Sequence, residues 1–122
     1  MMQRSPVHLI RGREAEDLAC ARLQQAGLTL TTRNYRSAYG EIDLIMQERD
    51  TLVFVEVRYR ASMDFGSPAE TVDARKQGRL RATAEYYLQN TPQASKKPCR
   101  FDIVALTGDG EGSDFRWLRN VF

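Results

Sequence analysis

The chain has 122 residues, a length that suits one domain with one hydrophobic core and excludes two independently folded cores. Its apolar content of 42% and charged content of 28% are those of an ordinary globular chain, and no stretch has the apolar run of a signal peptide or a membrane span. The net charge of +2 does not by itself indicate a polyanionic partner, although arginine outnumbers lysine by 15 to 3. We expect a cytoplasmic protein without a membrane partner, whose guanidinium groups are suited to phosphate contacts.

The first predicted element is a helix that follows a short arm. Residues 1–8 form the arm, which we expect to be flexible, and residues 9–122 form the single domain. Apolar side chains recur at helical spacing over residues 9–26, and Gly27 suits the C-terminal cap of that helix.

One carboxylate of this helix falls on its apolar side. At about 100° per residue, an apolar arc is formed by Ala15, Leu18, Ala19, Leu23 and Ala26. Glu16 lies inside this arc, whereas Asp17 lies outside it. A carboxylate that faces a core destabilises the fold unless it is paired or coordinated. We therefore expect Glu16 to face the sheet and to have a partner there.

Three strands are predicted to follow the helix. Residues 28–35 are rich in threonine and apolar side chains, which favour a strand. Residues 40–47 and 51–59 alternate apolar and polar side chains with a period of two. Because the second and third runs are separated by a short turn, the three strands form an antiparallel meander.

The turn between the second and third strands sets which side chains face each other. If residues 49–50 form a two-residue turn, Asp43 lies directly opposite Glu56, and Glu41 lies opposite Arg58, all on one face. Two carboxylates that face each other across a strand pair repel. A hard divalent cation with oxygen ligands is the usual means of neutralising such a pair.

The remaining elements complete a mixed sheet. Residues 67–70 (Ser-Pro-Ala-Glu) have the form of a capping box and predict a second helix that runs to about residue 88. Its inward side chains are expected to be Val72, Leu80, Ala84 and either Tyr87 or Leu88. Strands are predicted at residues 101–106 and 115–118, and Asp102 is expected to form a structural salt bridge. The order α-β-β-β-α-β-β predicts an α/β fold with a central mixed sheet flanked by helices.

Several of these motifs together resemble the YraN-like family. They are residues 12–19, 33–36, 40–45 (Gly-Glu-Ile-Asp-Leu-Ile), 53–58 (Val-Phe-Val-Glu-Val-Arg), Lys76 with 79–80, and 100–102 (Arg-Phe-Asp). The resemblance covers about residues 10–106. That family looks like a branch of the restriction-endonuclease-like fold, nearest the archaeal Holliday junction resolvases. The resemblance therefore implies a restriction-endonuclease-like core and a metal-dependent nuclease.

The resemblance also implies roles for individual residues. In the PD-(D/E)xK nuclease pattern, Asp43 stands at the aspartate position, Glu56 at the D/E position and Arg58 at the lysine position. The helical glutamate of resolvase-type members falls on Glu16. Arg58 departs from the pattern, because arginine stays protonated and cannot act as a base. It can still hold the attacking water or stabilise charge on the phosphorane.

The implied site would use Mg²⁺ or Mn²⁺. Asp43 and Glu56 would hold the ion, and Glu16 would bind it directly or through a water. Glu41 is either a ligand of a second ion or the cross-strand partner of Arg58. Phosphate contacts would come from Arg33, Arg36, Arg60 and Lys76.

Other readings of the same residues stay open. The partner of a nuclease would be DNA rather than RNA, in branched, nicked or single-stranded form. Alternatively, the protein is a nucleic-acid-binding module of the same fold that has lost catalytic turnover and keeps the same acidic residues. A third class is a scaffold protein with a large exposed apolar patch. Asp43 and Glu56 could instead form ion pairs with Arg58 and Arg36 on a solvated face. A junction resolvase would need a two-fold homodimer, and the sequence leaves the oligomeric state open.

Overall fold

The computed structural model describes residues 7–60, 72–108 and 114–122. In chain order the elements are α1 (Val7–Gln25), β1 (Thr29–Ser37), β2 (Gly40–Glu48), β3 (Thr51–Arg60), α2 (Ala74–Gln89), β4 (Cys99–Thr107) and β5 (Asp114–Leu118). The expected order α-β-β-β-α-β-β is confirmed. Within the described ranges, neither helix is both long and apolar enough to cross a membrane.

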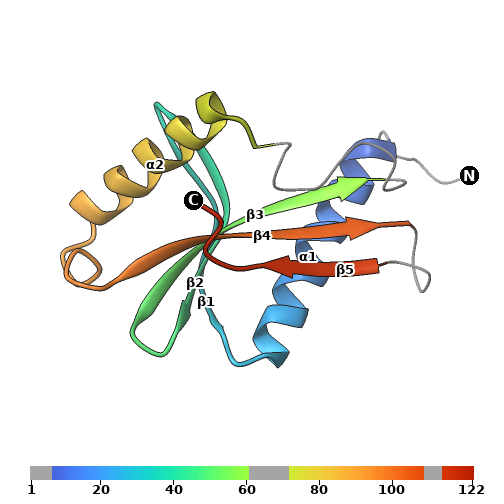
Figure 1. Cartoon of the computed structure of the whole chain (residues 1–122), viewed down its shortest axis with the longest axis horizontal. Coiled ribbons are helices and arrows are strands. Elements are labelled where there is room, and N and C mark those ends of the chain that lie inside the picture. Colours follow the sequence, from blue (N-terminus) through green and yellow to red (C-terminus); the bar gives the residue numbers. More distant parts are fainter. Residues whose placement is uncertain (1–6, 61–71, 109–113) are drawn as a thin grey trace, which may run out of the picture.

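The five strands form one mixed sheet in the order β1-β2-β3-β4-β5 (Figure 1). β1, β2 and β3 form an antiparallel meander, β3 runs parallel to β4, and β5 returns antiparallel at the edge. The parallel pair requires a crossover between β3 and β4, and α2 lies in that crossover. β3 is therefore the central strand of the sheet, with β2 beside it.

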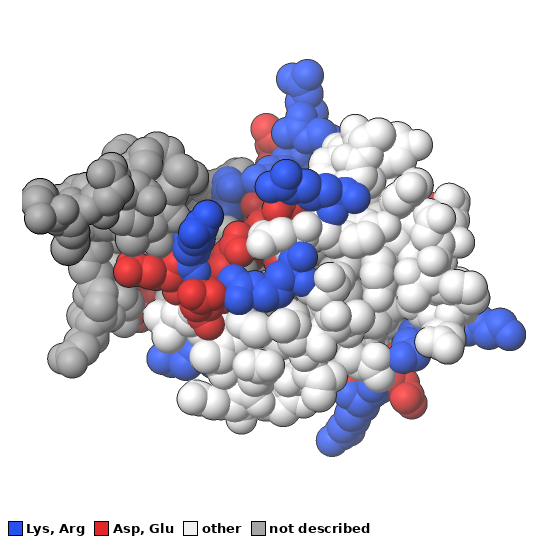
Figure 2. Space-filling view, turned by 180° about the vertical axis from the view of Figure 1, so that it is seen from behind, with Lys and Arg blue, Asp and Glu red and all other residues white. Residues whose placement is uncertain are grey.

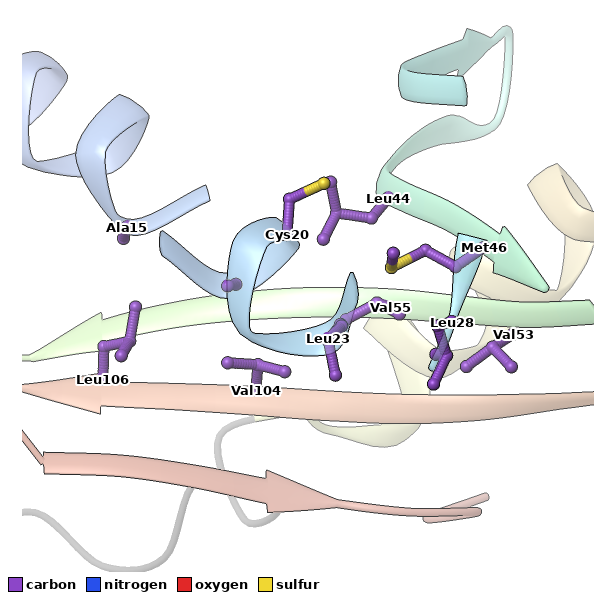
Figure 3. Packing of buried hydrophobic residues seen from close by; sticks show 11 residues of the cluster. Ala15, Cys20, Leu23, Leu28, Leu44, Met46, Val53, Val55, Val104 and Leu106 are labelled. Atoms are coloured by element: carbon purple, nitrogen blue, oxygen red, sulfur yellow. The ribbon is translucent and has the colours of Figure 1, made fainter. Parts of the chain in front are cut away.

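The two helices cover opposite faces of the sheet. Along β3, Val53 and Val55 pack with the α1 side chains Ala19 and Leu23, and Figure 3 shows this cluster. The alternate residue Phe54 packs with α2 instead, in a second buried cluster. This period-two division follows from the pleat of a strand that is buried on both faces.

Both helices differ from their predicted extents. α1 begins at Val7, so Val7 and His8 belong to the helix and not to an arm. Leu18, which we expected in the apolar arc, is exposed, because the buried arc of α1 is centred on Ala19 and Leu23. α2 begins at Ala74 and not at the expected capping box, whose residues lie outside the described ranges.

The start of α2 is set by a different capping residue from the one predicted. The carboxylate of Asp73 accepts a hydrogen bond from the Lys76 backbone N–H at 2.9 Å, which makes Asp73 the N-cap. The capping box at residues 67–70 favoured an earlier start, but Asp is as good an N-cap as Ser, and Asp73 caps α2. The inward residues predicted for the second helix are buried: Leu80, Ala84 and Tyr87 lie in α2, and Val72 lies just before its N-cap.

The turn between β1 and β2 is packed onto α2. The Ser37 and Thr83 hydroxyl oxygens lie 3.2 Å apart. A side chain added at Gly40 would lie 3.4 Å from the Thr83 hydroxyl and 3.6 Å from Cβ of Arg79. This close approach, at a positive φ of 156°, suits glycine and brings the start of β2 against the middle of α2.

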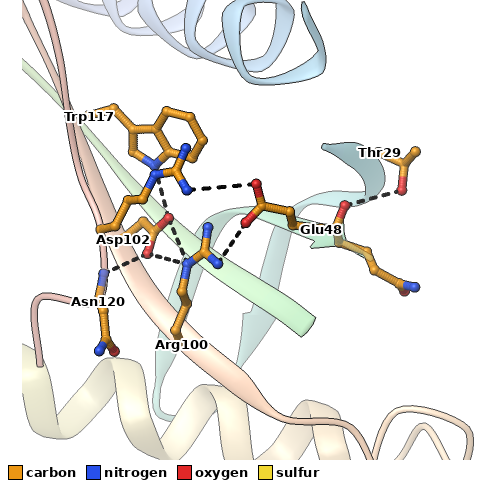
Figure 4. Close-up of polar contacts among 8 residues, drawn as sticks. Thr29, Glu48, Arg100, Asp102, Trp117 and Asn120 are labelled. Atoms are coloured by element: carbon orange, nitrogen blue, oxygen red, sulfur yellow. Dashed lines mark hydrogen bonds and ion pairs between the residues drawn. The ribbon is translucent and has the colours of Figure 1, made fainter. Parts of the chain in front are cut away.

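A buried polar network joins β4 to β5 and the C-terminal segment (Figure 4). The Asp102 carboxylate accepts hydrogen bonds from Arg100 Nε at 3.0 Å, Trp117 Nε1 at 2.9 Å and the Asn120 backbone N–H at 2.9 Å. Arg100 also pairs with Glu48 of β2 at 2.8 Å. The expected structural role of Asp102 is confirmed, because its side chain is fully buried and satisfied by these donors.

Candidate functional site

The site lies where β2 and β3 part. The two strands are paired from Glu48 opposite Thr51 up to Leu44 opposite Val55, which is the predicted register. The next positions in this register are Asp43 and Glu56. There the Val57 backbone N–H donates to Oδ2 of Asp43 at 2.8 Å, so the aspartate side chain takes the place of a strand partner. Beyond this point β2 continues towards α2, whereas β3 runs on beside β4.

A cavity of about 240 Å³ opens between the diverging strands and the first turns of α2. Its lining residues are Gly40, Glu41, Asp43, Glu56, Lys76, Arg79 and Leu80. Asp43 and Glu56 therefore face the same space, as the two-residue turn predicted. Three carboxylates and two cationic side chains line one small cavity, which suits a ligand that carries both a cation and an anionic group.

Glu56 is buried and already neutralised by two cations. The residue is 7% exposed. Its Oε2 lies 2.7 Å from the Lys76 Nζ and 3.4 Å from a guanidinium nitrogen of Arg58. The alternative of an Arg58–Glu56 ion pair is thus realised in part, although in a buried position and not on a solvated face.

Among the described residues, Asp43 has no comparable cationic partner. Burial, followed by the negative charge of Glu56, raises the pKa of Asp43 to about 8, and the hydrogen bond from Val57 opposes this rise. Glu16 and Glu41 add smaller contributions in the same direction. Among the described residues, no lysine or arginine forms an ion pair with Asp43. This carboxyl group is therefore poised to gain stability from an added cation.

Glu16 faces the sheet, as its position in the helix predicted. Its side chain is 22% exposed, compared with 67% for that of Asp17. The Glu16 carboxylate accepts hydrogen bonds from Asn34 at 3.1 Å and from Arg33 at 3.4 Å. Asn34 adopts a positive φ of 51°, and this conformation accompanies the contact with α1. The negative charge of Glu16 raises the pKa of Asp43, whereas the hydrogen bonds of Glu16 are to side chains of β1.

The described part of the chain contains no cluster of three or more His, Cys, Asp or Glu side chains arranged to hold a metal ion. The expected set of Asp43, Glu56 and Glu16 is therefore not assembled as three converging ligands, because Glu16 is held by β1 side chains. Two carboxylates are nevertheless sufficient for Mg²⁺, which keeps several waters and takes its remaining ligands from substrate phosphate. Asp43 and Glu56 fit this type of site.

Glu41 does not pair with Arg58, contrary to one of the two roles we expected for it. Its carboxylate lies 3.6 Å from Nε of Arg36, its partner on β1. The register that would place Glu41 opposite Arg58 ends at Leu44, because β2 leaves β3 after that residue. Glu41 still lines the cavity, beside Asp43.

The four predicted phosphate-binding residues have different surroundings. Lys76 lines the cavity, and the side chain of Arg36, which is 78% exposed, pairs with the cavity residue Glu41. Arg33 forms an ion pair with Asp17 at 2.8 Å, and the hydrogen bond that its guanidinium donates to that carboxylate raises the pKa of Arg33. Arg60 ends β3, and its side chain lies outside what the structure describes.

Arg79 is a cavity residue that sequence reasoning did not assign. It follows Lys76 by three residues on α2, so the two side chains share a helix face. This spacing was the signal in the sequence that could have identified Arg79.

Figure 2 shows the molecule from behind the view of Figure 1. Lys and Arg residues lie beside Asp and Glu residues in one region of this face, and much of the rest of the face consists of uncharged residues. The charges of the site are mixed and not uniformly basic.

The fold and the cavity define an α/β protein with two neighbouring carboxylates, one buried and one partly buried, at a strand divergence. Residues 15–106 match the uncharacterised protein family UPF0102, and the chain belongs to that family. This confirms the YraN-like family that the motifs predicted.

Relatives in the same family cover nearly the whole chain. A UPF0102 protein of Nitrosococcus oceani is 50% identical over 115 residues, which are 94% of this chain and 93% of that protein. A UPF0102 protein of Nitrosomonas europaea is 50% identical over 112 residues, and one of Pseudomonas entomophila is 49% identical over 112 residues. These two alignments cover 92% and 91% of both chains, respectively.

Proposed function

We propose that the protein is a cytoplasmic, metal-dependent nuclease that hydrolyses phosphodiester bonds of DNA. The observation that carries this proposal is the placement of Asp43 and Glu56 in one cavity, with a lysine ammonium 2.7 Å from Glu56. Paired carboxylates beside a cation are the parts that metal-assisted phosphodiester hydrolysis requires. The family resemblance assigns the same two residues.

Asp43 and Glu56 would hold Mg²⁺ or Mn²⁺. The residues fit such an ion, because Asp43 is partly buried next to a second carboxylate and lacks a cationic partner among the described side chains. A bound divalent ion would lower the pKa of a water and neutralise charge on the phosphate. Glu16, set behind Asn34 and Arg33, would act through its charge or through a water.

The chain's own side chains would position the reactants. Arg79 and Lys76 would contact non-bridging oxygens of the scissile phosphate, since both line the cavity. The water oxygen forms the new bond to phosphorus and gives up one proton to solvent as the bond to the 3′-oxygen breaks, and the leaving oxygen takes one proton from solvent. Buried Glu56 would keep the entering water and the cation in a fixed geometry.

Backbone contacts are expected to dominate recognition of the DNA. Arg36, which is largely exposed at the end of β1, supplies a phosphate contact near the cavity. The exposed Tyr39 at the β1–β2 turn offers a ring on which an unpaired base can stack. These features favour branched, nicked or single-stranded DNA over a regular duplex. Paired cleavage of a junction would additionally require a homodimer, which sedimentation with and without junction DNA tests.

A nucleic-acid-binding module without turnover is the second candidate. One observation favours it: Lys76 and Arg58 already neutralise Glu56, so half of the carboxylate pair is satisfied without any metal. Under this alternative the acids serve the architecture of the strand divergence. The exposed cations would still bind DNA.

A substrate panel with both metals separates the two candidates. Flap, junction, nicked and single-stranded DNA are incubated with the protein and either Mg²⁺ or Mn²⁺. The nuclease proposal expects slow, metal-dependent cleavage that Asp43→Asn removes. If the wild type binds these substrates and leaves all of them intact, while Asp43→Asn binds identically, the binding module is the correct assignment.

A further inference from the structure

We propose that Lys76, on helix α2, supplies the cation at the reaction centre. In the nuclease pattern this role belongs to a lysine on the strand, at the position where this chain has Arg58. This inference rests on the proposed nuclease function. It assigns Lys76 to the reacting phosphate and water, whereas Arg58 becomes a residue that holds Glu56 in place.

The two cations differ in what they face. Lys76 Nζ lies 2.7 Å from Oε2 of Glu56, and Lys76 lines the cavity together with Asp43. The contact from Arg58 to the same oxygen is longer, at 3.4 Å, and Arg58 is not part of the cavity wall. Arg58 also has a further interaction of its own. Of the two cations that contact Glu56, the ammonium of Lys76 is therefore the one that shares the space that a phosphate would enter.

The fold fixes the backbone of Lys76 while leaving its side chain able to move. The N-cap Asp73 accepts a hydrogen bond from the Lys76 N–H at 2.9 Å, and its carbonyl accepts one from Gln77 at 2.9 Å. The Lys76 side chain is 30% exposed, so solvent and ligand can reach it. Its four-carbon stem allows the ammonium to shift from Glu56 to a nearby oxygen without movement of the helix.

A compact ammonium suits this task better than a guanidinium. Its three donors can contact Glu56, a phosphate oxygen and the attacking water at once. In the protein without metal, the same ammonium neutralises Glu56 and so occupies the charge position that a divalent ion would take. A divalent cation and Lys76 should therefore compete for Glu56, because like charges repel strongly in a partly buried site.

The test compares Lys76→Met, Lys76→Arg and the matched control Arg75→Met, which removes an exposed charge from the preceding residue. We expect Lys76→Met to lower kcat by on the order of a hundredfold with the Kd for DNA within about threefold, as for loss of a group that acts in the transition state. Lys76→Arg should restore part of kcat. Arg75→Met should leave kcat unchanged.

A second readout does not depend on cleavage. In calorimetric titrations without DNA, Lys76→Met should bind Mn²⁺ roughly tenfold more tightly than the wild type, because the competing charge is gone. Arg75→Met and Lys76→Arg should bind Mn²⁺ as the wild type does. Circular dichroism melts establish that each variant is folded.

The outcomes separate this inference from the proposed function. A wild type that cleaves no substrate with either metal overturns both. An active wild type whose Lys76→Met variant keeps its kcat overturns the inference alone. The inference is also overturned if Lys76→Met loses kcat, Lys76→Arg does not restore any of it, and Lys76→Met binds Mn²⁺ with the affinity of the wild type. A purely structural role of Lys76 would then explain the loss.

Discussion

The carboxylate of Asp43 accepts the backbone N–H of Val57 at 2.8 Å, at the position where β2 stops pairing with β3. A side chain thus satisfies a backbone donor that the ladder no longer can. Because Val57 directly follows Glu56, this bond also fixes the distance between the two acidic residues. The strand divergence and the carboxylate pair are therefore one feature of the structure.

The first prediction concerns the two carboxylates. Asp43→Asn or Glu56→Gln should reduce metal-dependent cleavage by about a hundredfold or more, because each loses a metal ligand and a negative charge that holds the ion. DNA binding should persist or tighten in both variants, since a negative charge near phosphate is removed. Gel-based cleavage assays and fluorescence anisotropy measure the two quantities.

The matched control for this prediction is Asp50→Asn, which removes the same charge in the turn at the far end of the β2–β3 hairpin. It should leave the rate of cleavage unchanged. Equal rates for Asp43→Asn and Asp50→Asn would show that the cavity carboxylates take no part in cleavage.

The sequence predicted what depends on neighbouring residues. The β2–β3 register follows from a short turn and a period-two pattern, and the orientation of Glu16 follows from the helical period. The end of the β2–β3 ladder was not predictable, because it depends on how α2 packs against the start of β2. The proximity of Lys76 to Glu56 likewise depends on residues twenty positions apart that only the folded chain brings together.

A second prediction concerns Arg58. Arg58→Lys should retain or raise the rate of cleavage. The lysine side chain is shorter but can still reach Glu56, and lysine is the residue that the PD-(D/E)xK nuclease pattern has at this position. Arg58→Met should lower the free energy of unfolding by about 1–2 kcal/mol, since buried Glu56 loses one of its two cations. Single-turnover kinetics and urea denaturation measure these effects. A complete loss of cleavage in Arg58→Lys would mean that the guanidinium itself is required.

The third prediction is a pH dependence of stability in the absence of metal. The pKa of Asp43 is raised from 3.8 to about 8 in the folded protein, so between these values the unfolded chain releases a proton that the folded chain retains. This contribution makes the wild type less stable as the pH rises from about 4 to 8. Asp43→Asn lacks it and should be more stable than the wild type at pH 8, by about 1–3 kcal/mol.

The difference between the wild type and Asp43→Asn is the quantity to measure, because other groups titrate equally in both. Urea denaturation at pH 4.5 and pH 8 gives it directly. Adding Mg²⁺ at pH 8 should stabilise the wild type and not the variant, since only the wild type has the full carboxylate pair. A stability difference that stays constant with pH would show that Asp43 is ionised throughout this range.

The fourth prediction concerns Glu16. Glu16→Gln keeps the acceptor for Asn34 but removes a charge that raises the pKa of Asp43. Cleavage should fall by about tenfold, less than for Asp43→Asn, because Glu16 acts on the ion through its charge or a water. The exposed Glu14 of the same helix provides the control Glu14→Gln. The Mg²⁺ dependence of the rate measures the effect, and identical curves for the two variants would remove Glu16 from the site.

The last prediction separates architecture from function at Asp102. Its side chain is fully buried and accepts bonds from Arg100, Trp117 and the Asn120 backbone. Asp102→Ala should lower the free energy of unfolding by about 3–5 kcal/mol, because it leaves the largely buried Arg100 without its main partner. Asp114→Ala, which removes an exposed ion pair with Arg116, should cost less than about 1 kcal/mol. Urea denaturation measures both losses. A small effect at Asp102 would mean that Glu48 alone compensates Arg100, since that glutamate lies 2.8 Å from its guanidinium.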